Sequence, residues 1–199
     1  MSEIITDWIP FNQSKQVLRE AEENGRPMLV SGILQRAGAK NKNGRIYPKP
    51  MLKNEVQRYK EQLVEDRRAL GAVDHPSDDE VKLKRASHNI VDIWWDGDEV
   101  HGKIEVLKTP NGKILQGLFE SDINVGISSR GRGDVRKSPD GTIIVEDNFE
   151  LIAFDFVSNP STHQAFMSKI NESVEAETDP WATVRTKVQE IADTIDLKQ

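Results

Sequence analysis

The chain has 199 residues, of which 36% are hydrophobic, and this suits one domain with a modest core and a short appendage. Its 27 basic and 33 acidic residues give a net charge of −6, which disfavours specific binding of nucleic acid. The absence of cysteine excludes disulfides, thiolate metal sites and cysteine nucleophiles. No apolar run is long enough to cross a membrane and the start lacks a secretory pattern, so we expect a soluble protein with no membrane partner.

The spacing of apolar residues predicts the elements of the N-terminal part. Residues 1–26 are weakly patterned, with a short helix expected over 14–23. The apolar stretch 27–37 predicts a strand, and the polar stretch 38–48 predicts a loop. A helix is predicted after Pro50, because apolar residues recur at helical steps: Leu52, Val56, Tyr59 and Leu63.

The middle of the chain predicts short strands and one helix. A short strand at Ala72-Val73 leads to His75. Strands over 88–95 and 99–107 flank Asp96-Gly97-Asp98, a hairpin turn signature. A helix is predicted after Thr109, with one apolar face formed by Ile114, Leu115, Leu118 and Phe119.

More strands are predicted in the remainder of the main domain. One ends at Ser128 and Ser129, and others span about 142–145 and 149–157. A helix is predicted from 159 to about 170. Strands dominate, with helices interspersed. We therefore predict an α+β fold with a mostly antiparallel β-barrel core surrounded by helices.

The composition of the chain changes at Asn171. Residues 172–180 carry four acidic side chains and no basic one, which is typical of a linker. Apolar residues at helical steps then predict a separate helix over 181–197. The sequence thus predicts an N-terminal segment (1–26), a main domain (27–171) and a tail (172–199).

The strongest chemical signal lies in Asn124-Val125-Gly126-Ile127-Ser128-Ser129-Arg130-Gly131-Arg132-Gly133. An apolar strand ends at two hydroxyls and enters a loop rich in glycine and arginine. The arginines supply fixed positive charge for an oxyanion or an acidic side chain. A structural turn is the alternative interpretation, because serine and glycine are common in turns.

A serine nucleophile needs a base, and His75 in Gly71-Ala72-Val73-Asp74-His75-Pro76 is the best candidate. A surface loop histidine is the alternative interpretation. His88 and His101 fall in predicted hairpin strands, where packing is the default role, and His163 lies near a predicted helix start.

Asp155 interrupts the apolar run Leu151-Ile152-Ala153-Phe154-Asp155-Phe156-Val157. A carboxylate in a buried strand needs a partner to offset its desolvation, and a histidine that becomes imidazolium is such a partner. Strand alternation allows the opposite interpretation, in which Ala153, Asp155 and Val157 face solvent. The run by itself favours neither interpretation.

A metal-dependent hydrolase is a separate hypothesis, built on Asp74, His75, Asp78 and His88. The spacing of these residues matches no established zinc pattern. We therefore expect no metal and no cofactor.

The chain resembles the prohead proteases of tailed phages, in particular those of T-even-like phages, over residues 27–167. Four short motifs carry the resemblance through their order and spacing. They are Asn43-Gly44-Arg45-Ile46-Tyr47-Pro48, Val73-Asp74-His75-Pro76, Gly126-Ile127-Ser128-Ser129-Arg130-Gly131, and Phe154-Asp155-Phe156-Val157-Ser158-Asn159-Pro160, the last followed by Ala165.

This resemblance implies a serine endopeptidase that cleaves scaffold (core) and major capsid proteins inside the assembling prohead, in the host cytoplasm. It also implies a fold distantly similar to herpesvirus assemblin, a β-barrel surrounded by helices. The family's histidine falls on His75, its nucleophile on Ser128 and its acidic residue on Asp155. Ser129, on the opposite face of the strand, is the alternative nucleophile.

The implied mechanism assigns further residues. Backbone N–H groups of the 129–133 loop, with Ser129, Arg130 and Arg132, are expected to stabilise the oxyanion or contact substrate. Arg130, Arg132 or Arg136 could also read an acidic substrate side chain, with a phosphate or nucleic-acid contact as the alternative for this patch.

Proteases resembling this chain tend to cut after Glu in Leu/Ile-x-Glu contexts. The chain contains Ile170-Asn171-Glu172 at its predicted domain border, which predicts self-cleavage after Glu172. Leu118-Phe119-Glu120 and Ile144-Val145-Glu146 also match, but they fall in or beside predicted regular structure, where the backbone is protected.

The expected partners are scaffold and capsid proteins as substrates, together with further copies of the chain in a homo-oligomer. A non-catalytic capsid or scaffold-binding assembly module is the alternative function, because such a module could keep the fold without turnover. A serine-reactive probe distinguishes the two functions.

Overall fold

The computed structural model describes residues 3–11, 27–121, 123–158 and 168–169. They belong to one compact unit, Met1–Lys169, and a second unit, Ile170–Gln199, lies outside the described residues. The helices predicted over 14–23 and 181–197 also lie outside them. None of the helices in the described ranges is long and apolar enough to span a bilayer.

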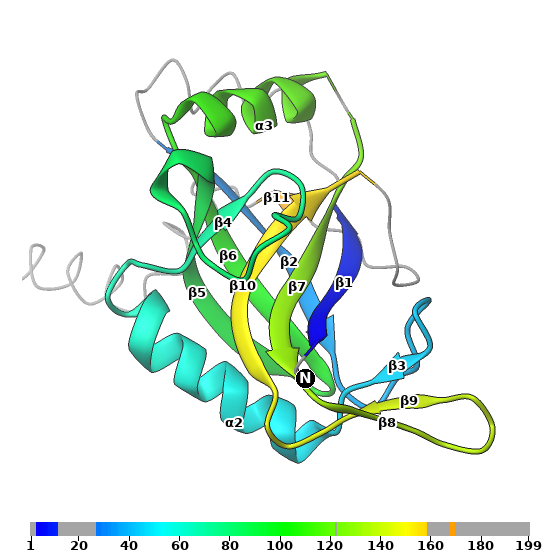
Figure 1. Cartoon of the computed structure of the whole chain (residues 1–199). Coiled ribbons are helices and arrows are strands. Elements are labelled where there is room, and N and C mark those ends of the chain that lie inside the picture. Colours follow the sequence, from blue (N-terminus) through cyan, green and yellow to red (C-terminus); the bar gives the residue numbers. More distant parts are fainter. Residues whose placement is uncertain (1–2, 12–26, 122, 159–167, 170–199) are drawn as a thin grey trace, which may run out of the picture. The chain divides into compact units, whose positions relative to one another are not determined.

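The described strands form three sheets (Figure 1). The first has the order β1 (Glu3–Phe11), β7 (Val125–Gly133) and β10 (Glu150–Val157). The second has the order β11 (Ser168–Lys169), β2 (Met28–Arg36), β6 (Glu99–Val106), β5 (Ala86–Asp96) and β4 (Leu70–Ala72). The third has the order β3 (Arg45–Ile46), β9 (Ile143–Val145) and β8 (Val135–Lys137).

Pairing is antiparallel within the two larger sheets, as predicted for the core. In the small third sheet β3 and β9 pair in parallel. Over the described residues the strands form separate sheets and do not close into a barrel. The strand-rich α+β character of the prediction is therefore confirmed, whereas a closed barrel is not seen.

Two α-helices accompany the sheets within the described ranges, together with a short 3-10 helix, Leu83–Arg85. Helix α2 (Lys49–Tyr59) continues into a π-helical turn, Lys60–Val64, and α3 (Pro110–Glu120) follows the hairpin of β5 and β6. Thr109 caps α3, because its Oγ1 accepts a hydrogen bond from the Gly112 N–H at 3.0 Å. Figure 1 places α2 and α3 at opposite ends of the sheets.

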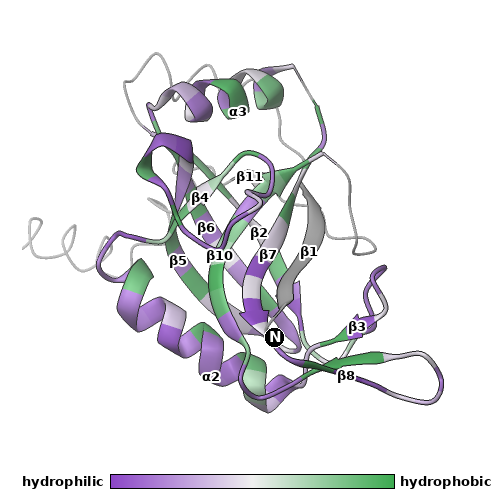
Figure 2. Cartoon of the chain, in the orientation of Figure 1, coloured by the Kyte–Doolittle hydropathy of each residue, from purple (hydrophilic) through white to green (hydrophobic). Residues whose placement is uncertain are grey.

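The core is formed by apolar side chains from both large sheets and from α2. In Figure 2 the ribbon of α2 is largely hydrophilic, with interruptions by apolar positions. These apolar positions are the buried side of the helix: Met51, Leu52, Val56 and Tyr59. The apolar residues whose spacing predicted this helix thus form the face that packs against the core.

Helix α2 also stabilises an irregularity in β10. The register of β10 against β7 shifts between Leu151 and Ala153, as expected for a β-bulge. Side chains from α2 bind the backbone there: the Leu151 N–H donates to Glu55 at 2.9 Å, and Arg58 donates to the Leu151 carbonyl at 2.7 Å. The strand that carries Asp155 is therefore attached to α2.

Three expectations from the sequence are wrong in detail. Residues 129–133 are not a loop but the second half of β7, paired with β1 on one side and β10 on the other. Residues 3–11, left in a weakly patterned segment, form β1. The predicted helix over 159–170 ends in a strand, because Ser168–Lys169 is β11, and residues 159–167 lie outside the described ranges.

Candidate active site

Ser128 lies in the central strand of the three-stranded sheet, directly opposite Asp155 on β10. Both side chains are buried. Because alternate residues of a strand share a face, Ser128 and Arg130 point to one side and Ser129 to the other. The register of β7 and β10 therefore brings a hydroxyl, a carboxylate and a guanidinium to one face of the sheet.

His75 reaches this face from the segment that follows β4. Val73 forms a parallel bridge with Phe156, and the Asp74 N–H donates to the Phe156 carbonyl at 2.7 Å. Asp74 has a φ of 60°, a left-handed conformation that aspartate tolerates better than most residues. This turn ends the contact with β10 and directs His75 towards Ser128.

The three side chains form one hydrogen-bonded chain. His75 Nε2 lies 2.8 Å from Ser128 Oγ, and His75 Nδ1 lies 2.9 Å from Asp155 Oδ2. An ionised carboxylate can only accept hydrogen bonds, so Nδ1 carries the imidazole proton. Nε2 is then free to accept the hydroxyl proton of Ser128, which is the arrangement of a general base beside a nucleophile.

Asp155 is buried but stays ionised because of its partners. Burial alone raises the pKa of this carboxyl group, yet hydrogen bonds from His75 and Arg130, and the charge of Arg130, hold the pKa below its ordinary value. The Ala72 N–H also donates to Asp155 Oδ1, at 3.0 Å. The carboxylate is thus available to orient the imidazole and stabilise its protonated form.

Ser129 is not brought to the site. It is buried on the other face of β7, where its Oγ accepts a hydrogen bond from Gln35 Nε2 at 3.1 Å. This contact joins β7 to β2 across the core. The structure therefore separates the two adjacent serines, and only Ser128 contacts a histidine.

The arginines lie differently from what the sequence predicted. Arg130 is buried and pairs with Asp155, with Nε 2.7 Å from Oδ2. Arg132 is half exposed and pairs with Glu150 and Asp79, and it lies four residues from Ser128, about 13 Å along an extended strand. Arg136 is exposed and pairs with Glu146. Residues 129–133 are a strand paired on both sides and not the loop expected from the sequence, and the oxyanion or substrate-binding role of this segment and its side chains stays a prediction.

His88 contributes to the site in a way that the sequence did not reveal. It is fully buried on β5, with Nε2 2.9 Å from the Phe154 carbonyl and Nδ1 2.8 Å from Ser87 Oγ. Burial lowers its pKa to about 4, despite the nearby Asp155 charge that raises it. A neutral His88 thus fixes the backbone immediately before Asp155. The sequence placed His88 at the start of a predicted strand and predicted a packing role, and only the polar neighbours Ser87 and Asn89 could have indicated more.

The metal-hydrolase hypothesis finds no support in the described part of the chain. No group of three or more potential ligands lies together there. His75 and His88 have other partners, as described above, and the Asp78 carboxylate pairs with Lys82 and Arg85.

Comparison with known proteins agrees with this geometry. A family model described as prohead core protein serine protease matches residues 2–177. The prohead core protein protease of Enterobacteria phage T4 is 34% identical over 158 residues, covering 76% of this chain and 74% of that protein. A solved structure of the bacteriophage T4 capsid assembly protease matches with a TM-score of 0.69 and 26% identity, covering 78% of this chain and 98% of that chain. The chain therefore belongs to the family of prohead core protein serine proteases.

Proposed function

We propose that this serine protease uses Ser128, His75 and Asp155 as its nucleophile, general base and orienting carboxylate. The observation that carries the proposal is the continuous chain of contacts from Ser128 Oγ through His75 to Asp155, at 2.8 and 2.9 Å. General-base catalysis of this kind contributes about 10²–10⁴-fold to the rate.

In the proposed reaction, Ser128 Oγ forms a bond to the scissile carbonyl carbon while its proton moves to His75 Nε2. His75 returns this proton to the leaving amine as the C–N bond breaks, which leaves an acyl-enzyme on Ser128. Water, deprotonated by His75, then hydrolyses the ester and restores the hydroxyl. Asp155 keeps Nδ1 protonated and balances the transient positive charge.

We propose scaffold (core) and major capsid proteins as substrates, cleaved inside the assembling prohead in the host cytoplasm. The support is the family membership and the similarity to a protein described as a capsid assembly protease. An assembling shell holds many copies of each component, so we also propose that the protease acts as a homo-oligomer. Assemblin remains our proposed distant structural relative, with the two larger sheets as the counterpart of its barrel.

We propose cleavage after Glu in Leu/Ile-x-Glu contexts, with self-cleavage after Glu172. The two other matching sites lie in or beside regular structure: Glu120 is the last residue of α3, and Glu146 follows β9 with its N–H bonded to the Asp134 carbonyl at 2.9 Å. A protease needs an extended substrate segment, so both sites are protected in the folded chain. We place the border between the protease domain and the tail at this cleavage site, which gives the proposed division into 27–171 and 172–199. Strand β1 is added to the protease domain.

The experiment that tests the function is labelling with a fluorophosphonate probe, combined with the intact mass of the purified chain after incubation. We expect the wild type and Ser129→Ala to be labelled and to lose the segment after Glu172, and Ser128→Ala to do neither. Labelling that persists in Ser128→Ala and disappears in Ser129→Ala would show that the nucleophile is assigned wrongly. A wild type that is neither labelled nor cleaved would support the non-catalytic assembly module instead.

A further inference from the structure

The guanidinium of Arg130 binds both oxygens of the Asp155 carboxylate. Nε lies 2.7 Å from Oδ2 and Nη2 lies 3.4 Å from Oδ1. The arginine side chain is only 1% exposed and the aspartate side chain is fully buried. Water therefore screens this ion pair very little, and the pairing geometry is fixed by two hydrogen bonds.

These contacts saturate the carboxylate. A carboxylate has about four acceptor positions. In Asp155, Oδ2 accepts from His75 Nδ1 and Arg130 Nε, and Oδ1 accepts from the Ala72 N–H and Arg130 Nη2. Removal of Arg130 leaves two of the four positions empty in a buried site. The carboxylate could then rotate away from His75.

Arg130 is also the cation that compensates the charge of Asp155 when His75 is neutral. Two further titratable groups, Tyr59 on α2 and His88 on β5, also interact with the charge of Asp155. Burial raises the pKa of Tyr59 above its ordinary range and lowers that of His88 to about 4, so both are neutral near pH 7. Neither offsets the negative charge.

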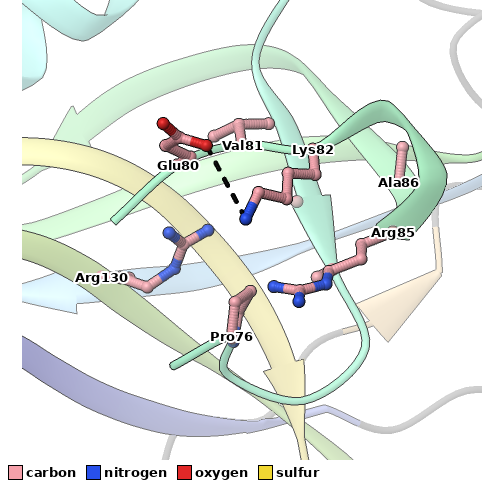
Figure 3. Close-up of a pocket in the computed structure, with 9 residues that line it drawn as sticks. Pro76, Glu80, Val81, Lys82, Arg85, Ala86 and Arg130 are labelled. Carbon is pink, nitrogen blue, oxygen red and sulfur yellow. Dashed lines mark ion pairs between the residues drawn. The ribbon is translucent and has the colours of Figure 1, made fainter. Parts of the chain in front are cut away.

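The same guanidinium holds the loop that continues from His75. Arg130 Nη1 donates to the Asp78 carbonyl at 3.2 Å. Figure 3 shows Arg130 at one side of a pocket that is also lined by Pro76, Lys82 and Arg85. Ser128 is not among the residues that line this pocket. Arg130 thus contacts both the Asp155 carboxylate and the loop that continues from His75.

From this geometry we infer that Arg130 is a positioning residue: it holds Asp155 in the orientation that His75 requires and does not bind the oxyanion or the substrate. His75 Nδ1 and Arg130 Nε meet on one oxygen, Oδ2, so the arginine acts on the imidazole through the carboxylate. The inference rests on the proposed roles of Ser128, His75 and Asp155.

The test compares wild type with Arg130→Gln, which removes the charge, and Arg130→Lys, which keeps the charge and loses the two-point geometry. Arg36→Gln is the matched control, because it also removes an arginine from a partly buried ion pair. Arg36 on β2 pairs with Glu99 on β6, with Nε 2.8 Å from Oε1. Each variant is assayed by the rate of fluorophosphonate labelling as a function of pH, by hydrolysis of a peptide with the sequence of residues 166–178, and by circular dichroism for folding.

For Arg130→Gln we expect labelling and peptide kcat to fall together by about 10²-fold, with KM little changed. We also expect the acidic limb of the labelling profile to move to higher pH, because loss of the Arg130 charge and hydrogen bonds removes interactions that hold the pKa of Asp155 low. In Arg130→Lys the acidic limb of the labelling profile should stay in place, because the positive charge is kept. This variant should be labelled about tenfold more slowly than wild type, because the two-point contact with Asp155 is lost. Arg36→Gln should label as wild type does.

Two results would overturn the inference. Normal labelling with a raised KM for the peptide would make Arg130 a substrate-binding residue. A loss of labelling that only follows the folded fraction, with the acidic limb unmoved, would make its role structural. If Arg130→Gln fails to fold, Arg130→Lys decides, because wild-type labelling by that variant would show that the two-point geometry is not needed.

One readout is independent of catalysis. The Nδ1 proton of His75 should be visible by NMR in the wild type, protected by its bond to Asp155, and should be lost by exchange in Arg130→Gln. A proton that persists in this variant would contradict the inference even if the wild type proved inactive. A wild type that shows the His75 Nδ1 proton by NMR but is not labelled by fluorophosphonate would count against the proposed protease mechanism. It would leave the positioning role of Arg130 intact.

Discussion

At the scale of single residues, His88 shows how a buried side chain supports the site without touching substrate. In the neutral imidazole Nε2–H donates to the Phe154 carbonyl, and Nδ1 accepts a hydrogen bond from the Ser87 hydroxyl. A protonated imidazole has no acceptor nitrogen and could not make the second bond. The His88 ring also packs edge-on against Phe156, with centroids 4.7 Å apart. Protonation would place a second donor against a hydroxyl in an apolar setting.

This arrangement predicts a pH-dependent stability. The pKa of His88 is about 4 in the folded chain and 6.5 in a free side chain. Between these values the unfolded chain binds a proton that the folded chain does not, so the free energy of unfolding falls as pH decreases from 6.5 to 4. The contribution of His88 to this fall is about 3 kcal/mol.

Urea unfolding at pH 7 and pH 5 checks the prediction. His88→Gln should be less stable than wild type at pH 7 and should show a smaller loss between the two pH values. His101→Gln is the control, because His101 is partly exposed and pairs with Glu99. An equal loss in wild type and His88→Gln would show that other groups cause the pH dependence.

At the scale of elements, β4 approaches β10 very closely at Gly71. A Cβ atom added to Gly71 would lie 2.0 Å from the Phe154 carbonyl oxygen and 2.4 Å from the His88 ring. Neither group can move easily, since the carbonyl belongs to β10, which is paired along β7, and His88 is fixed at both ring nitrogens. Glycine is therefore required for the contact that brings the His75 segment to Asp155.

We predict that Gly71→Ala lowers the free energy of unfolding by about 3 kcal/mol or more, because two rigid groups must move apart. Gly117→Ala is the matched control. Gly117 lies exposed within α3 with no atom within 4 Å of the added carbon, so alanine there should stabilise by about 0.5–1 kcal/mol. Denaturant unfolding of the two variants should give opposite signs. A mild effect of Gly71→Ala would mean that β4 and β10 can separate at little cost.

The elements also show what local pattern could and could not predict. Strand β2, helices α2 and α3 and the hairpin of β5 and β6 follow from apolar spacing and turn residues, because short-range preference and burial agree there. Strand β1 and the second half of β7 were missed, because Gly131 and Gly133 suit a loop by composition, and only pairing on both sides makes this segment a strand. Asp155 and Glu150, which pair with Arg130 and Arg132, lie on β10, and these pairs are set by the register of β10 against β7. No local sequence pattern specifies this register. The sequence placed Arg130 in an oxyanion or substrate-binding loop, whereas the structure places it in β7, paired with Asp155. The roles of Ser128, His75 and Asp155 come from short motifs that resemble a family, because no local pattern specifies how three distant residues meet.

At the scale of the whole molecule, the proposed self-processing gives a further prediction. Glu172→Gln should stop the loss of mass on incubation, because the acidic side chain after which the chain is cut is gone. Glu120→Gln and Glu146→Gln should be processed as wild type is, since both sites lie in or beside regular structure. Intact mass measurement after equal incubation checks all three variants. A truncated Glu172→Gln chain of the same mass as truncated wild type would contradict the assignment of this site.

Strand β7 lies between β1 and β10, the first and the last long strands that the structure describes. The Ser128 hydroxyl on β7 therefore comes close to the Asp155 carboxylate only after the chain through Val157 has left the ribosome and β10 has paired with β7. A nascent polypeptide that already displays His75 and Ser128 has no aspartate to orient the imidazole. In the proposed mechanism the pairing of β10 with β7 is therefore the step that completes the triad, and the order of synthesis places this step after the folding partners of His75 and Ser128 have been made.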